Sequence, residues 1–134
     1  MKHPERVEDY LEHIIQAIQR ATSYIEDFEN AEALQQDSRT QDAVIRNIEI
    51  IGEAANHLQN MSPAFVANHP ELPWLEMRGM RNKVAHEYFD VDWDMVWDTV
   101  KDDLPQLKQQ IDGLLTVYRQ EPEEQQDEGQ DQRP

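Results

Sequence analysis

The sequence VIRNIEIIGEAANHL, residues 44–58, decides the fold class of this chain. Its apolar residues return every three or four positions, which is the spacing of one face of an α-helix and not of a β-strand. The stripe consists of Val44, Ile48, Ile51, Ala55 and Leu58, widened by Ile45 and Ile50. We predict a helix that begins near Ser38 or Thr40, either of which can cap it, and ends near Leu58. Gly52, in its middle, is expected to permit close packing of another helix.

The segments before and after this helix show the same spacing. A first helix is predicted from about Glu5 to Phe28. Its inward positions are Val7, Leu11, Ile14, Ile15, Ile18, Ala21, Ile25 and Phe28. Ser62 and Pro63 predict a single helical turn, because proline favours the first helical position. A third long helix is predicted to begin near Pro73 and to continue through the charged residues that follow.

The fourth predicted helix follows a break at residues 89–92, where Asp90 or Asp92 can cap it, and it runs to about Tyr118. Pro105 is expected to kink or split it, since proline lacks the N–H that the helix needs. Its inward positions are Val96, Trp97, Val100, Leu104, Leu107, Ile111, Leu114 and Leu115. These elements predict an all-α, up-and-down four-helix bundle formed by residues 1–119. Residues 120–134 are acidic and contain no apolar side chain, so we predict a disordered tail.

Composition narrows the possible functions of the chain. The net charge is −16, from 12 basic and 28 acidic residues, and such a protein should repel nucleic acid unless its basic residues gather on one surface. Cysteine is absent, which excludes disulfides and thiolate chemistry. Neither a secretory signal nor a membrane-spanning apolar run is visible. We therefore expect a cytoplasmic protein without membrane partners. The chain has no glycine-rich phosphate loop, and we expect no cofactor.

The segment RNKVAHEY, residues 81–88, is the one dense cationic cluster of this acidic chain. Arginine binds phosphate as a planar fork. Histidine exchanges protons near neutral pH, because its unperturbed pKa is about 6.5. With no metal ligands nearby, this combination predicts metal-free attack on a phosphodiester. The candidate residues are Arg81 and His86 for catalysis, Asn82, Arg78 and Lys83 for support and RNA binding, and Tyr88 beside them.

The spacing of the two candidate catalytic residues raises a geometric question. Arg81 and His86 would be about 140° apart around a continuous helix, so they would not reach one phosphate. Either the helix ends between them, or the arginine of one subunit meets the histidine of another. We favour the second arrangement as part of the answer, because it also doubles the positive charge in one cleft.

Two other classes of function stay open at this stage. A helical module could use the same exposed surface to bind a partner protein or a nucleotide without cutting anything, and the acidity of the chain favours this alternative. Glu49, Glu53 and His57 share a helix face, but bundles that bind two metal ions use matching strings on several helices. A second string is missing here, so we expect no metal site.

The segment 81–88 has the pattern Arg-x4-His-x-Tyr and resembles the HEPN ribonuclease motif, in the form found in HepT-like toxins of bacterial and archaeal toxin–antitoxin pairs. Three further blocks resemble the same family in the same order: IIGEAA at 50–55, HPELPW with MRGMRN between 69 and 82, and DDLPQL at 102–107. The resemblance covers about 7–118, nearly all of the predicted helical domain.

This resemblance implies an all-helical homodimer that cleaves RNA, with tRNA as a substrate class, without a metal or a cofactor. It places Arg81 and His86 in the catalytic pair and Asn82 at a position where the family favours a polar residue. It implies that the chain is the toxin of a type VII toxin–antitoxin system. The partner would be a minimal nucleotidyltransferase antitoxin, which attaches AMP to the hydroxyl of Tyr88 and can join the toxin in a larger assembly.

Overall fold

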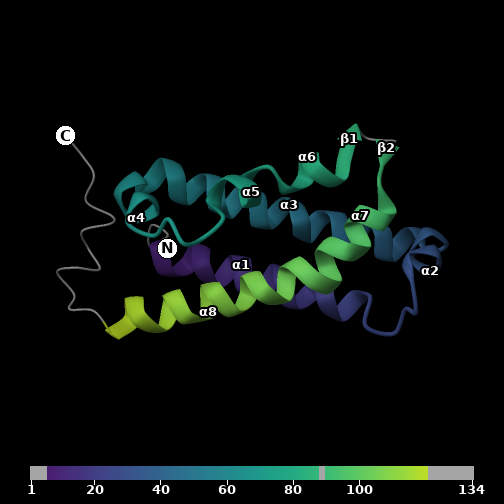
Figure 1. The fold of residues 1–134 in the computed structure, drawn as a ribbon, viewed down its shortest axis with the longest axis horizontal. Coiled ribbons are helices and arrows are strands. Elements are labelled where there is room, and N and C mark those ends of the chain that lie inside the picture. Colours follow the sequence, from purple (N-terminus) through teal and green to yellow (C-terminus); the bar gives the residue numbers. More distant parts are fainter. Residues whose placement is uncertain (1–5, 88–89, 121–134) are drawn as a thin grey trace, which may run out of the picture.

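The computed structural model describes residues 6–87 and 90–120, and the side chains of 85–87 are outside this description. The regular elements of the described residues are helices, apart from two short strands (Figure 1). In chain order the elements are α1 Val7–Tyr24, α2 Ala31–Gln35, α3 Ser38–Met61, α4 Pro63–Ala67, α5 Trp74–Arg78, α6 Met80–Val84, β1 Ala85–Glu87, β2 Asp90–Val91, α7 Trp93–Asp98, the π-helical η1 Thr99–Asp103, and α8 Leu104–Gln120.

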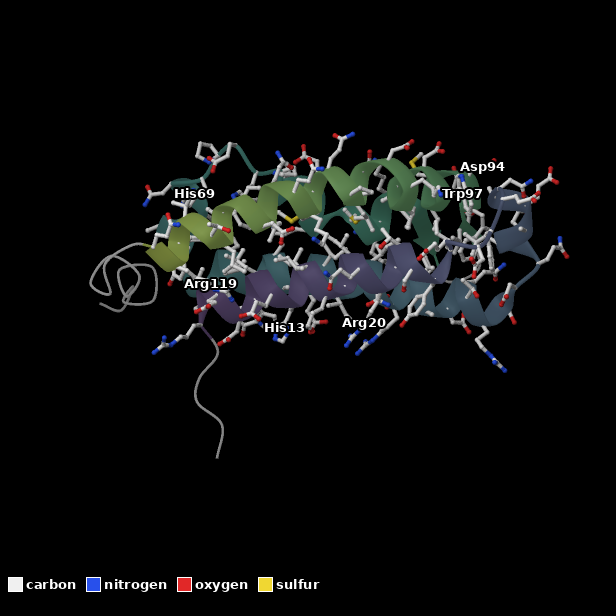
Figure 2. The ribbon with its side chains drawn as sticks, turned by 90° about the horizontal axis from the view of Figure 1, so that it is seen from below. His13, Arg20, His69, Asp94, Trp97 and Arg119 are labelled. Atoms are coloured by element: carbon white, nitrogen blue, oxygen red, sulfur yellow. The ribbon has the colours of Figure 1, made fainter. Side chains whose placement is uncertain are left out.

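The long helices run back and forth along the long axis of the molecule. Helix α3 returns antiparallel to α1, α5 and α6 return along α3, and α7, η1 and α8 lead back along α1 (Figure 1). The apolar stripes of these helices meet in one buried core. Arg119 of α8 fastens the last helix to the first through ion pairs with Glu8 and Glu12 of α1, the latter at 2.9 Å (Figure 2). The predicted all-helical class and the packing of a long last helix on the first are confirmed.

The cap of α3 differs by one residue from the prediction. Asp37, and neither Ser38 nor Thr40, is the N-cap, and its carboxylate accepts a hydrogen bond from the Thr40 N–H at 3.0 Å. Helix α2 was not predicted, because five residues are too few for a periodic pattern to be recognised. It is held by its Asn30 cap and by the fully buried Leu34.

The predicted third long helix is wrong. In its place are two five-residue helices, α5 and α6, and the chain then leaves the helical conformation altogether. Strand β1 pairs antiparallel with β2, with Ala85 opposite Val91, and the Asp92 N–H donates to the Val84 carbonyl at 2.8 Å. The pairing takes up backbone groups that a continued helix would have used, so residues 81–84 of the charged segment are helical and 85–87 form a strand.

The last helical stretch changes its hydrogen-bond pattern just before Pro105, and the predicted kink or split stays a prediction. Proline cannot donate to the carbonyl four residues before it, and its ring crowds that carbonyl. The turn Thr99–Asp103 is π-helical, and the Leu104 N–H donates to the Thr99 carbonyl five residues back.

Two predicted helix starts are confirmed. Asp92, one of the two predicted caps, caps α7 by accepting a hydrogen bond from the Met95 N–H at 3.0 Å. The Pro63 turn, α4, is confirmed as well.

Two further predictions concern the C-terminal tail and the absence of a membrane-spanning helix. The predicted disordered tail lies almost wholly at 121–134, outside the described residues, so the domain boundary at 119 stays a prediction. Among the described helices, none is long and apolar enough to cross a membrane.

Candidate functional site

Gly52 fixes the position of α5 and α6 on α3. A Cβ atom at this glycine would stand 3.1 Å from the Met77 carbonyl oxygen and 3.5 Å from that of Arg78. The first distance is shorter than ordinary van der Waals contact, so a larger residue would require the Met77 carbonyl to shift by a few tenths of an ångström. The predicted role of Gly52 in close helix packing is therefore confirmed. The contact holds the residues just after α5 against the adjacent turn of α3.

Arg81, the first candidate catalytic residue, lies on α6 and faces α3. Its Nε atom is 3.6 Å from Oε2 of Glu49. The two side chains are 34% and 43% exposed, so the ion pair is open to solvent. Helices α5 and α6 run antiparallel to α3 (Figure 1), and Gly52 contacts Arg78. Glu49 comes three residues before Gly52 and Arg81 comes three residues after Arg78, so the two side chains lie opposite each other. The glycine contact thus determines which acid meets the arginine.

The backbone changes direction between Arg81 and His86. Helix α6 ends at Val84, whose side chain is fully buried, and His86 lies in the middle of β1. The separation of about 140° applied to a continuous helix, and it does not apply to this backbone. Of the two arrangements left open by the sequence, the helix end between the residues is the one found within the chain. The side chain of His86, and all of Tyr88, lie outside the described residues.

The supporting residues divide between two sides of α6. Lys83 faces η1, where its Nζ atom is 3.6 Å from Oδ2 of Asp103, while Arg81 faces α3. Asn82 and Arg78 are exposed. The structure therefore turns Arg81 and Lys83 toward different neighbouring elements. Lys83 instead borders a separate cavity of about 240 Å³ between α5–α6 and η1–α8, which has an apolar floor formed by Met77, Met80 and Leu107.

Glu49, Glu53 and His57 of α3, which the sequence places on one helix face, contact different partners. Glu49 meets Arg81, whereas Glu53 lies 3.8 Å from Nε2 of His57. The His57 ring is stacked on Tyr10 of α1, with ring centres 5.4 Å apart. Across 6–87 and 90–120 there is no group of three histidine, cysteine or acidic side chains arranged to hold a metal ion.

Sequence reasoning missed Glu49 and Asp103 as partners of the motif. Glu49 had been considered only as a metal ligand, and Asp103 only as part of a family pattern. A signal for Glu49 was present in Gly52, since a glycine inside a helix marks a close crossing and the residue one turn earlier then lies beside the crossing element. Nothing comparable pointed to Asp103.

Comparison with known proteins places this fold and motif in a family. Residues 14–114 match the family described as "Ribonuclease HepT-like". A protein of Thermococcus cleftensis called a probable ribonuclease HepT is 45% identical over 109 residues, covering 79% of this chain and 93% of that protein. A putative RNase of Caldanaerobacter subterraneus is 34% identical over 106 residues, covering 79% of this chain and 91% of that protein. No solved structure gives a significant match.

The chain therefore belongs to the HepT-like ribonuclease family, and the resemblance noted in the sequence is confirmed at this level. The family implies RNA as the substrate. A larger relative shows that the domain also occurs joined to another activity. This protein of Methanocaldococcus jannaschii is described as a gamma-glutamylcyclotransferase and putative RNase, and it is 38% identical over 105 residues, which are 46% of its length.

Proposed function

We propose that this protein is a metal-independent endoribonuclease in which Arg81 and His86 act on one RNA phosphate. The observation that carries the proposal is the end of α6 at Val84, which removes the angular separation that a continuous helix would impose. Arg81 is partly exposed on a helix that is anchored to α3, so its guanidinium can meet a phosphate from solvent.

The proposed reaction uses the nucleophile that RNA itself carries. The 2′-oxygen attacks the adjacent phosphorus, a 2′-O–P bond forms, and the bond from phosphorus to the 5′-oxygen breaks. Arg81 stabilises the negative charge that builds up on the phosphoryl oxygens. His86 acts as general base on the 2′-hydroxyl or as general acid that protonates the leaving 5′-oxygen. The products are a 2′,3′-cyclic phosphate and a 5′-hydroxyl.

The end groups of the cleaved RNA test this mechanism. Purified protein is incubated in EDTA with total RNA and with tRNA, the substrate class that the resemblance implies, and the fragment ends are identified chemically. We expect cleavage that leaves cyclic phosphate and 5′-hydroxyl ends. Fragments with a 5′-phosphate, or cleavage that EDTA abolishes and a divalent metal restores, would contradict the proposal.

The acidity of the chain bears on how it binds RNA. The net charge is −16, and on α6 both Arg81 and Lys83 lie beside an acid. A homodimer that brings two motifs into one cleft would pool their positive charge.

Mixing inactive Arg81→Ala with inactive His86→Ala tests whether two subunits share one site. If each site uses the arginine of one subunit and the histidine of its partner, mixed dimers regain about a quarter of wild-type activity, because half of the dimers are mixed and each has one complete site. No recovery in verified mixed dimers would contradict a shared site.

Tyr88 is the proposed point of control by a nucleotidyltransferase antitoxin, in a type VII toxin–antitoxin pair. AMP on its hydroxyl adds bulk and negative charge two residues from His86, and both would hinder an approaching phosphate. We expect Tyr88→Phe to remain toxic in cells that also make the active antitoxin. Equal neutralisation of Tyr88→Phe and wild type would show that the tyrosine is not the switch.

A non-catalytic module that binds a nucleotidyltransferase is the second candidate. It is favoured by the excess of acid and by the acidic partners of Arg81 and Lys83, which reduce the attraction for RNA. The two candidates differ in what Arg81→Ala does to toxicity. Loss of toxicity with fold and partner binding intact supports the nuclease, and full toxicity supports the module.

A further inference from the structure

We infer that Glu49 is a positioning residue for the ribonuclease reaction, acting through the guanidinium of Arg81. The inference rests on the proposed role of Arg81 and adds a residue that lies outside the motif, on another helix. It starts from the ion pair between Arg81 Nε and Glu49 Oε2, whose atoms are 3.6 Å apart.

The backbone on both sides of this pair is fixed. Gly52 lies one turn from Glu49 and is in close contact with the Met77 and Arg78 carbonyl oxygens, just before Arg81 in the chain. Val84, at the other end of α6, is fully buried. An arginine side chain is long and flexible, and it binds phosphate best when its planar fork is held in advance. With both backbones held, the Glu49 carboxylate restricts where the guanidinium can lie.

The contact is made on the Nε side of the guanidinium. This group is a rigid planar fork, so a contact at Nε constrains the direction of the whole fork. The same carboxylate places a negative charge beside the position of an RNA phosphate. Glu49 thus has two opposite effects on the reaction: it orients Arg81, which favours turnover, and it repels the substrate, which weakens binding.

A role in folding stability does not account for the pair. Both side chains are more than one-third exposed, and exposed ion pairs contribute little to stability because water screens them and side-chain entropy opposes them. The consequence of removing Glu49 should therefore appear in the kinetics and not in the unfolding temperature.

Glu53 supplies a matched control on the same helix. It lies one turn after Glu49, it is exposed, and its carboxylate faces His57 at 3.8 Å. Glu49→Gln and Glu53→Gln each remove one negative charge from this face of α3 without changing side-chain size. Only the first removes the charged partner of Arg81.

The test is steady-state cleavage of a fluorogenic RNA by both variants, with thermal unfolding as a check on the fold. We expect KM to fall about two- to fivefold in both, since a single solvent-exposed charge has a small effect. We expect kcat to fall about two- to fivefold in Glu49→Gln alone, because an exposed ion pair can supply no larger factor. Equal kcat values for the two variants would overturn the inference.

Two further variants connect the effect to Arg81. Glu49→Asp keeps the charge but shortens the reach, so KM should stay at the wild-type value while kcat falls. This variant also serves if Glu49→Gln unfolds. In an Arg81→Ala background, Glu49→Gln should cause no further fall in the residual single-turnover rate, and a further fall would overturn the inference. Wild-type activity in Arg81→Ala would instead refute the proposed function, so the two failures are distinguishable.

Discussion

Replacing Gly52 by alanine tests how closely α5 approaches α3. The added Cβ would stand 3.1 Å from the Met77 carbonyl oxygen, and Met77 is fully buried, so this oxygen has little room to move. Alanine improves helix propensity by about 1 kcal/mol relative to glycine. Overpacking a tight contact costs about 1–3 kcal/mol. The two effects leave a net loss of about 0–2 kcal/mol in the free energy of unfolding.

Gly113 provides the matched control for this substitution. It lies inside α8 and is exposed, and among the described residues no atom outside the adjacent backbone of its own helix lies within 4 Å of the position where a Cβ would stand. Gly113→Ala should therefore stabilise the protein by about 0.5–1 kcal/mol, the propensity gain alone. Urea unfolding of both variants measures the difference, which is the packing cost at Gly52. Equal stabilisation by the two substitutions would refute the close approach of α5.

The same pair of variants connects packing to activity. Gly52→Ala should lower RNA cleavage, because moving α5 and α6 by a few tenths of an ångström displaces Arg81 relative to its partner Glu49. Gly113→Ala should leave cleavage unchanged, since α8 carries no residue of the motif.

Three further predictions concern other contacts. Arg119→Ala should lower the unfolding temperature at low salt, because it removes the ion pairs to Glu8 and Glu12. The difference in unfolding temperature from wild type should vanish near about 1 M salt, where these pairs are screened, and a difference that persists there would contradict this. Lys83→Ala should raise KM for RNA and leave kcat unchanged, because Lys83 faces Asp103 and not the Arg81 side of α6. A lower kcat would contradict this and place Lys83 in the catalytic site. Asn47→Leu should keep or raise stability in urea unfolding, since the buried Asn47 Oδ1 has no hydrogen-bond partner among the described residues and its Nδ2 donates only to a helix carbonyl, that of Ala43. A loss above about 2 kcal/mol would contradict this.

The long helices were predictable from the sequence because each carries an apolar stripe several turns long. Helices α1, α3 and α8 bury these stripes, whereas the π-helical turn before α8 was not predicted. A periodic pattern averages over many residues, so it is reliable for long elements and weak for short ones. Helix α2 and the two strands are too short to carry such a pattern.

The sequence nominates the residues of the candidate site by their chemistry, and it does not predict how the backbone arranges them. The segment 81–88 stands out by its chemistry, but helical periodicity continued past the point where the helix ends at Val84. The end depends on pairing between β1 and β2, which joins residues on both sides of 88–89. The division of Arg81 and Lys83 between Glu49 and Asp103 likewise follows from tertiary packing, which one sequence does not display.

The most direct test of the account is single-turnover cleavage of RNA by wild type, Arg81→Ala, His86→Ala and the double variant, all shown to be folded. The account predicts that each single substitution lowers the rate by about 10²–10⁴, and that the double variant is hardly worse than either, because the two residues serve one step. Wild-type cleavage by His86→Ala would contradict the account, because the strand that follows α6 would then carry no part of the site.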